Sequence, residues 1–125
     1  MELAIHNWMR AESLEHTLDR ISKLDYSYLE IQGAPESYDT KKVKLPLDVY
    51  GIKCWGSVTL MLEERNLLAK DPTQRKMSIQ YVKDLAKMVA DLGGSVISLV
   101  PATVGKIIPD ATPEQEWEWA VEGVQ

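Results

Sequence analysis

The stretch QYVKDLAKMVADLGGSVISLVP, residues 80–101, runs from a helical pattern through a pair of glycines into a short apolar segment. The helix begins upstream at Asp71, a strong N-cap, and ends at Gly93, which readily adopts a left-handed backbone. Its apolar stripe consists of Met77, Tyr81, Leu85, Met88, Val89 and Leu92. The apolar segment at 95–101 is typical of a buried strand, so this stretch predicts a helix followed by a strand.

The same alternation extends toward both ends of the chain. Apolar runs predict three earlier strands, at 3–8, 28–33 and 52–60. Helical patterns begin near Ser13, near Asp39 and at Thr112, where TPEQ has the form of a capping box with Gln115 reaching back. Pro46 falls inside the second of these helices, which we therefore expect to be short or kinked. Strands that alternate with helices indicate an α/β protein with a parallel sheet.

Two architectures fit this alternation: an open doubly wound sheet, or part of a (β/α)8 barrel. Such a barrel needs about 250 residues, and the four units here occupy 125. The last helical pattern also reaches Gln125 without a stop signal. We therefore expect residues 1–125 to be a single (βα)4 segment, the first four units of a (β/α)8 TIM barrel.

Composition restricts the functional classes. Apolar residues make up 45% of the chain and charged residues 26%, which is typical of a globular protein. The net charge of −5 argues against a nucleic-acid partner, whose phosphates require a basic face. No segment approaches the roughly 20 apolar residues of a membrane span, so no membrane partner is expected. The single cysteine, Cys54, cannot form an internal disulfide, which favours a cytoplasmic location.

The alternation of side chains along each predicted strand separates an aliphatic face from a mixed face. In a barrel the aliphatic face meets the helices, and the mixed face points inward toward the carboxyl ends of the strands, where such enzymes place their chemistry. The residues expected on that rim are His6, Trp8, Glu30, Gln32, Trp55 and Ser57. An aromatic wall of this kind suits the apolar face of a sugar ring.

Structural roles remain open for the same residues. His6 fits a hydrogen-bonded core histidine equally well, and Glu30 fits an ion pair with Lys53 on the neighbouring strand. Trp8 and Trp55 also fit ordinary packing.

Other chemistry-bearing patterns are weak or absent. The sequence contains no GxGxxG, GxxxxGK[ST], HExxH or GxSxG motif, and its two histidines have no metal-site spacing. Cys54 is expected to be a small buried hydrophobe. Trp117 and Trp119, on the last predicted helix, are expected in packing or at an interface.

Four segments together resemble the first half of the sugar phosphate isomerase/epimerase-like barrels, the xylose isomerase-like superfamily. They are LAIHNW, YLEIQG, YGIKCWGSVTLM and QYVKDLAKMVADLGGSVISLVP. The resemblance implies a divalent metal, Mn or Mg, held by two Glu, one Asp and one His on later strands that this chain does not contain. It also implies a substrate-binding role for His6, Trp8, Glu30 and Trp55. The segment CWGSVTLM is also similar to the larger subunits of bacterial C-glycoside deglycosidases, which work with a small partner subunit.

The resemblance implies a metal-dependent sugar isomerase or epimerase that abstracts a proton next to a sugar carbonyl. One alternative is a C-glycoside deglycosidase large subunit that cleaves 3-oxo-C-glycosides by elimination. Another is a non-catalytic half-barrel that needs a partner chain, whether the remaining half of the barrel, a small subunit or a second copy. A finished four-stranded binding module is a further possibility. The 125-residue chain is expected to be inactive alone.

Overall fold

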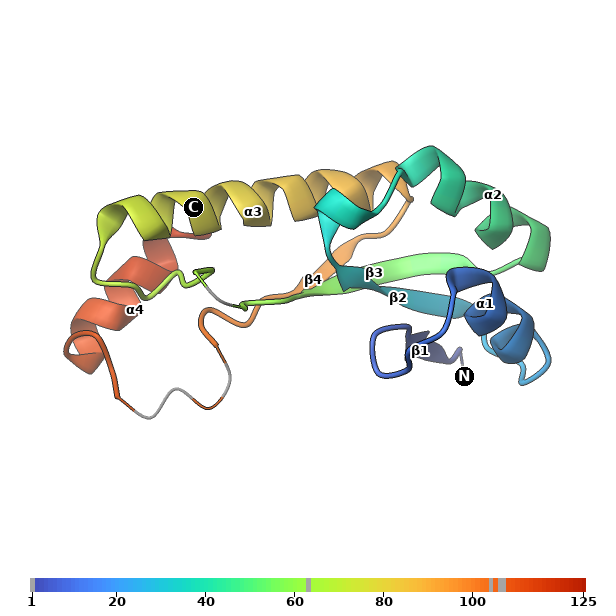
Figure 1. The fold of residues 1–125 in the computed structure, drawn as a ribbon, viewed down its shortest axis with the longest axis horizontal. Helices are drawn as coiled ribbons and strands as arrows, with labels where there is room; N and C mark the ends of the chain where they lie inside the picture. The colour runs from blue at the N-terminus through green and yellow to red at the C-terminus, as the bar shows by residue number, and fades with distance from the viewer. Residues whose placement is uncertain (1, 63, 104, 106–107) are drawn as a thin grey trace.

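The computed structural model describes residues 2–62, 64–103, 105 and 108–125, and its core is one four-stranded sheet (Figure 1). The strands are β1 (Ala4–His6), β2 (Tyr28–Gly33), β3 (Lys53–Thr59) and β4 (Val96–Ser98). They lie in the order β1-β2-β3-β4, and each is parallel to the next along the chain. The predicted α/β class and parallel topology are confirmed.

A helical segment follows each strand. The helices are α1 (Leu14–Ser22), α2 (Thr40–Tyr50), α3 (Pro72–Asp91) and α4 (Pro113–Glu122), with a 3-10 turn η1 (Pro35–Ser37) before α2. The predicted N-caps are confirmed, because each accepts a hydrogen bond from a backbone N–H of the first turn; they are Ser13, Asp39, Asp71 and Thr112. Gly93 has a φ of 81°, as its predicted role at the end of α3 requires.

The structure differs from the predicted helices in the length of the helix that contains Pro46 and in the capping box at Thr112. The helix that contains Pro46 is not short: α2 runs for 11 residues through the proline. Its Val43 and Leu47 are buried, and this burial offsets the one backbone hydrogen bond that proline removes. At α4 the capping box is half formed, because the Gln115 side chain donates to Glu118 instead of reaching back to Thr112.

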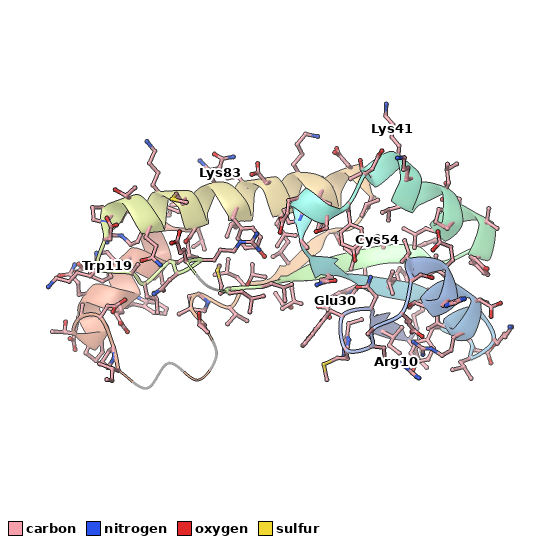
Figure 2. The ribbon with its side chains drawn as sticks, viewed as in Figure 1. Arg10, Glu30, Lys41, Cys54, Lys83 and Trp119 are labelled. Carbon is pink, nitrogen blue, oxygen red and sulfur yellow. The ribbon has the colours of Figure 1, made fainter. Side chains whose placement is uncertain are left out.

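The helices cover one face of the sheet. Leu29, Ile31 and Cys54 lie on that face and are buried against residues of α1 and α3 such as Leu18 and Leu85. Side chains on the opposite face stay partly exposed, and Figure 2 shows Glu30 and Cys54 on opposite sides of the sheet. The sheet therefore has a covered face and an open face, as the inner surface of an incomplete barrel would have.

A β-bulge changes which residues reach the open face. Leu29 pairs with Cys54, but the next pair joins Glu30 to Gly56, so Trp55 has no partner on β2. The alternation along β3 is shifted beyond this point, and Ser57 turns to the covered face. The prediction that Ser57 lies on the rim is wrong: it is fully buried, and its hydroxyl donates to the Ile31 carbonyl at 2.6 Å.

The predicted apolar stripe of α3 needs one correction, and the two tryptophans of the last helix differ in their surroundings. Met77 is 58% exposed, whereas the neighbouring Ser78 is buried. α4 buries none of its residues, and Figure 1 shows it beyond the carboxyl ends of the strands, beside the start of α3. Trp119 packs there, with the Arg75 guanidinium 4.4 Å from its ring centroid. Trp117 is 71% exposed.

Candidate functional site

The open face of the sheet carries a hollow at the first three strands. His6 and Glu30 are direct partners in the β1–β2 register, and the bulge turns Trp55 to the same side. The three residues line a cavity of about 310 Å³ together with Ala4 and Ile5. The fold thus brings together three of the residues that the sequence predicts to bind substrate, although that role stays a prediction.

Trp8 extends this surface into a second hollow. Its ring centroid lies 4.8 Å from that of His6, with the two planes tilted by 31°. On its other side Trp8 borders a cavity of about 260 Å³ at the ends of β3 and β4. The other lining residues are mostly apolar: Val58, Thr59, Leu60, Met61, Leu62, Val100, Ala102 and Thr103. The His6–Trp8 stack therefore joins a polar hollow to an apolar one.

The structural alternatives for His6 and Glu30 are not seen. The register places Tyr28, not Glu30, opposite Lys53, and Glu30 and Lys53 form no ion pair. The His6 Nδ1 atom is buried without a hydrogen-bond partner, so His6 is not the hydrogen-bonded core histidine of the alternative reading. A buried imidazole nitrogen without a partner and a carboxylate outside any ion pair suit a polar ligand.

Asn7 joins the carboxyl ends of β1 and β2, and sequence reasoning missed it. Its Oδ1 accepts from the Gln32 N–H at 2.7 Å, and its Nδ2 donates to the Tyr38 hydroxyl at 3.1 Å. The Tyr38 hydroxyl also lies 3.5 Å from the side-chain oxygen of Gln32, which the sequence placed on the rim. Asn7 lies between His6 and Trp8 in the sequence and so fixes the turn that carries both. The only local indication of this role in the sequence was an amide side chain placed between the two aromatic residues His6 and Trp8.

Tyr81 joins the ends of β2 and β3 from the side of α3. Its hydroxyl donates to the Gly33 carbonyl and accepts from the Leu60 N–H, each at 2.7 Å. Burial raises the pKa of Tyr81, so its hydroxyl keeps its proton at neutral pH. The sequence predicted Tyr81 only as an apolar stripe residue, because no local pattern records a contact between residues so far apart in the chain.

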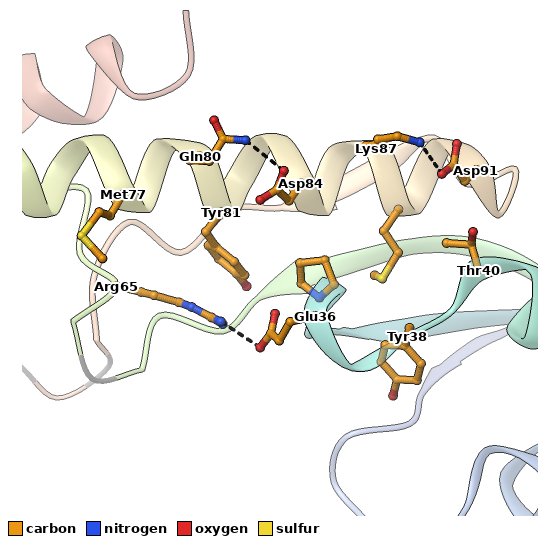
Figure 3. A pocket seen from close by; sticks show the side chains of 12 residues that line it. Glu36, Tyr38, Thr40, Arg65, Met77, Gln80, Tyr81, Asp84, Lys87 and Asp91 are labelled. Carbon is orange, nitrogen blue, oxygen red and sulfur yellow. Dashed lines mark hydrogen bonds and ion pairs between the residues drawn. The ribbon is translucent and has the colours of Figure 1, made fainter.

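Arg65 and Glu36 lie next to the Tyr81 ring, below α3 in the view of Figure 3. The Arg65 guanidinium is 4.0 Å from the Tyr81 ring centroid and donates to the Glu36 carboxylate at 2.8 Å. Partial burial raises the pKa of Glu36, but the hydrogen bond from Arg65, a backbone hydrogen bond and the Arg65 charge outweigh it and hold that pKa below its usual value. On the next strand pair, the Thr59 hydroxyl accepts from the Val100 N–H at 2.8 Å. Side chains thus tie each neighbouring pair of strand ends.

A larger hollow lies away from the open face, between η1 and α3 (Figure 3). It measures about 600 Å³, but its charged side chains already have partners within it. Arg65 pairs with Glu36, Lys87 with Asp91, and Gln80 donates to Asp84. We assign no site to this groove.

No metal centre is formed within the described part of the chain, where no three His, Cys, Asp or Glu side chains come close enough to hold an ion. Cys54 is buried as predicted, and burial raises the pKa of its thiol to about 11, so it is not a nucleophile. None of the helices within the described ranges is long and apolar enough to cross a membrane.

Comparison with known proteins identifies the fold but no sequence family. No protein-family model matches the chain, and no curated protein matches it. A D-psicose 3-epimerase from Clostridium cellulolyticum H10, solved with D-tagatose, matches with a TM-score of 0.79 and 24% identity over 99% of this chain and 46% of that one. A D-allulose 3-epimerase from Methylomonas sp. matches with a TM-score of 0.85 and 17% identity over 99% and 45%.

The 3-keto-D-glucoside 4-epimerase of E. coli matches with a TM-score of 0.78 and 16% identity, over 99% of this chain and 49% of that one. The fold is therefore that of the first four βα units of a TIM barrel, as in these three proteins. The chain spans less than half the length of each of these three proteins.

Proposed function

We propose that this chain is the substrate-binding half of a sugar epimerase or isomerase. The observation that carries the proposal is the shared hollow of His6, Glu30 and Trp55 on the open face of the sheet, beside the stacked Trp8. The proteins that share the fold are named as epimerases of ketoses or of a keto-glucoside, which supports the proposal.

The roles assigned to these residues are binding and orientation. The apolar face of a sugar ring packs against the exposed rings of Trp8 and Trp55, which are 41% and 37% exposed. The Glu30 carboxylate accepts from sugar hydroxyls, and the His6 ring, which lines the same hollow, adds a polar edge to it. Epimerisation removes a proton next to the sugar carbonyl and returns it to the opposite face. We assign that proton transfer to none of the residues in this chain.

The divalent metal that the resemblance implies, Mn or Mg, does not fit the described residues, which form no ligand cluster. We propose that its ligands belong to four later βα units, whether on the same polypeptide or on a partner chain. The contribution of this chain is then the sugar-facing wall, and the isolated chain is expected to show no turnover.

The second hollow favours one alternative function. A free ketohexose carries oxygen on every carbon, whereas the cavity beside Trp8 is bordered mainly by aliphatic side chains such as Leu60, Leu62 and Val100. An apolar aglycone attached to the sugar would match it better. C-glycoside cleavage is therefore the second candidate. A base removes the proton from the carbon next to the 3-oxo group, and a double bond forms between that carbon and the carbon that bears the aglycone. The aglycone leaves with its bonding electron pair and takes up a proton.

The coding sequence beyond Gln125 provides the test. We expect it to encode four further βα units with acidic and histidine residues at the strand ends. The complete protein, supplied with Mn²⁺ or Mg²⁺, is expected to interconvert D-fructose, D-tagatose or D-allulose with an epimer, with deuterium incorporated from D2O. A reading frame without those units, in a protein that exchanges no sugar proton, refutes the proposal.

Substitutions connect activity to this site. Trp55→Ala is expected to raise the KM for the sugar by about tenfold or more, because it removes an aromatic contact. Trp117→Ala, which changes an exposed tryptophan on α4, is the matched control and is expected to leave KM unchanged. A 3-oxo-C-glycoside with an aromatic aglycone separates the two functions, since release of free aglycone indicates elimination.

A further inference from the structure

We propose that Tyr81, with Arg65 and Glu36, is a positioning unit that holds the carboxyl ends of β2 and β3 at the spacing the sugar site requires. What those strand ends bind rests on the proposed function. That the three residues hold the strand ends follows from their contacts, of which those at Leu60 also reach the border of the apolar hollow.

The Tyr81 hydroxyl takes the place of the next backbone hydrogen bond between β2 and β3. The β2–β3 pairing ends where Gly33 meets Thr59. The phenol then bridges the Gly33 carbonyl and the N–H of Leu60, which follows Thr59, at 2.7 Å on each side. A Cβ on Gly33 would lie 2.1 Å from the Val58 carbonyl oxygen and 3.0 Å from the Tyr81 hydroxyl. Glycine is therefore required where the strand and the phenol approach.

Arg65 and Glu36 join the same two segments a second time. Arg65 belongs to the loop after β3 and Glu36 to η1 after β2, and their ion pair spans the two at 2.8 Å. The guanidinium also covers the Tyr81 ring at 4.0 Å and donates to the Leu60 carbonyl at 3.4 Å. In Figure 3 the ion pair and the phenol lie next to each other beneath α3. Leu60 is therefore held through both its N–H and its carbonyl.

This bridge reaches the border of the apolar hollow at Leu60 and lies one residue away from the turn that carries His6 and Trp8. Gln32, which precedes Gly33, is bonded to Asn7 in the turn that carries His6 and Trp8. Leu60 and the two residues after it border the apolar hollow. A shift of the β3 end by about 1 Å would move that border, and displacements of this size are costly to binding and catalysis. Tyr81 thus acts on the sugar site indirectly. It holds the backbone of the strand ends and does not itself contact the ligand.

The first experiment uses the 125-residue chain and needs no substrate. Tyr81→Phe removes one oxygen and keeps the ring that Arg65 covers; Tyr50→Phe on α2 is the matched control. We expect the Leu60 amide hydrogen to exchange about tenfold faster in Tyr81→Phe, because its acceptor is lost. The Tyr50→Phe variant is expected to match the wild type at Leu60.

The second experiment uses the complete epimerase with D-fructose. Tyr81→Phe is expected to raise KM by about tenfold and to lower kcat by less than about threefold, since the displaced wall binds but does not transfer protons. A general loss of stability would instead lower the active fraction and leave KM unchanged. Tyr50→Phe controls for that loss.

If the Leu60 amide hydrogen exchanges at the wild-type rate in Tyr81→Phe, the proposed bridging role of the hydroxyl is refuted, whatever the activity shows. Faster exchange with an unchanged KM would overturn the positioning role and leave a purely structural bridge. A wild-type protein that turns over none of the sugars would refute the proposed function and with it the sugar-positioning role. The exchange result would then still decide whether the hydroxyl holds the strand ends.

Discussion

At the scale of single residues, two glycines mark the closest approaches within the sheet. A Cβ on Gly33 would lie 2.1 Å from the Val58 carbonyl oxygen, and a Cβ on Gly56 would lie 2.0 Å from the Val96 carbonyl oxygen. Both obstacles are backbone atoms of a neighbouring strand and cannot rotate away. Gly123 differs, since its nearest obstacle is a methyl of the Leu67 side chain at 3.1 Å and its φ is −70°.

Gly33→Ala is therefore expected to lower the free energy of unfolding by more than about 2 kcal/mol, because β2 and β3 must separate to admit the methyl group. Gly123→Ala is expected to change it by less than about 1 kcal/mol, because Leu67 can adjust and alanine accepts the helical backbone. Urea denaturation of both variants measures the difference. Equal losses in the two would contradict the tight contact at Gly33.

Trp55 illustrates how one residue decides what the open face displays. Simple alternation along β3 places Trp55 and Ser57 on the same side. The bulge keeps Trp55 beside His6 and Glu30 but sends Ser57 into the core, where its hydroxyl is satisfied by the Ile31 carbonyl. The candidate site therefore contains the expected Trp55 ring but not the Ser57 hydroxyl that was expected beside it.

At the scale of elements, α3 begins at a cap that the sequence predicted. The Asp71 side chain accepts from the Thr73 N–H at 2.9 Å, and Pro72 occupies the first turn. Because α3 carries Tyr81 to the strand ends, its stability bears on the site as well as on the core.

Asp71→Ala is expected to lower the free energy of unfolding by about 1 kcal/mol, since a backbone N–H loses its acceptor. Asp71→Asn, which keeps a side-chain acceptor, is expected to retain most of that stability. Chemical denaturation monitored by circular dichroism compares the two. Equal losses in the alanine and asparagine variants would indicate that charge, not capping, is what matters at this position.

The loop after β3 and the turn after β2 are joined by an ion pair that depends on pH. The pKa of Glu36 is lower in the folded chain than its ordinary value of 4.5, so ionised Glu36 stabilises the fold. That stabilisation is complete above the unfolded-state pKa and is lost as the pH falls through the lower, folded-state pKa.

The thermal midpoint of the wild type is accordingly expected to fall more steeply than that of Glu36→Gln as the pH is lowered from about 5 to about 3. The effect is expected to be small and to shrink in salt, because the Glu36 side chain is 55% exposed. Glu15→Gln, on α1 and outside the ion pairs found, is the control. Parallel curves for wild type and Glu36→Gln would show that the pair adds nothing.

At the scale of the whole molecule, the sheet has two free sides. β1 pairs only with β2 and β4 only with β3 among the described strands, and the inner face between them is partly exposed. Unpaired strand edges and exposed apolar surface favour association with another chain. In a closed barrel both edges would be paired and the face covered.

The isolated chain is therefore expected to self-associate at micromolar concentration, giving a light-scattering mass well above 14.1 kDa after size exclusion. Adding the missing βα units, on the same polypeptide or on a second one, is expected to replace that association with a defined species. A stable monomer of 14.1 kDa that unfolds cooperatively would instead support a finished four-stranded module.

Much of this fold was predictable because helix and strand signals are local. Asp71 caps its own first turn and Gly93 ends the same helix, so both were read correctly from neighbours within a few residues. The alternation of strands and helices then led to a parallel sheet, and the polarity of β1 and β2 placed His6 and Glu30 on one face.

The sequence by itself determined the succession of elements, their caps and the class of fold, since each depends on hydrogen bonds and apolar spacing within one segment. Only the tertiary structure decided the bulge at Trp55, the burial of Ser57 and the bridging role of Tyr81. These depend on groups far apart in the sequence: the Gly56 backbone lies against Val96, and the Tyr81 hydroxyl lies between Gly33 and Leu60. No local pattern records such contacts, because they exist only once the strands are packed side by side.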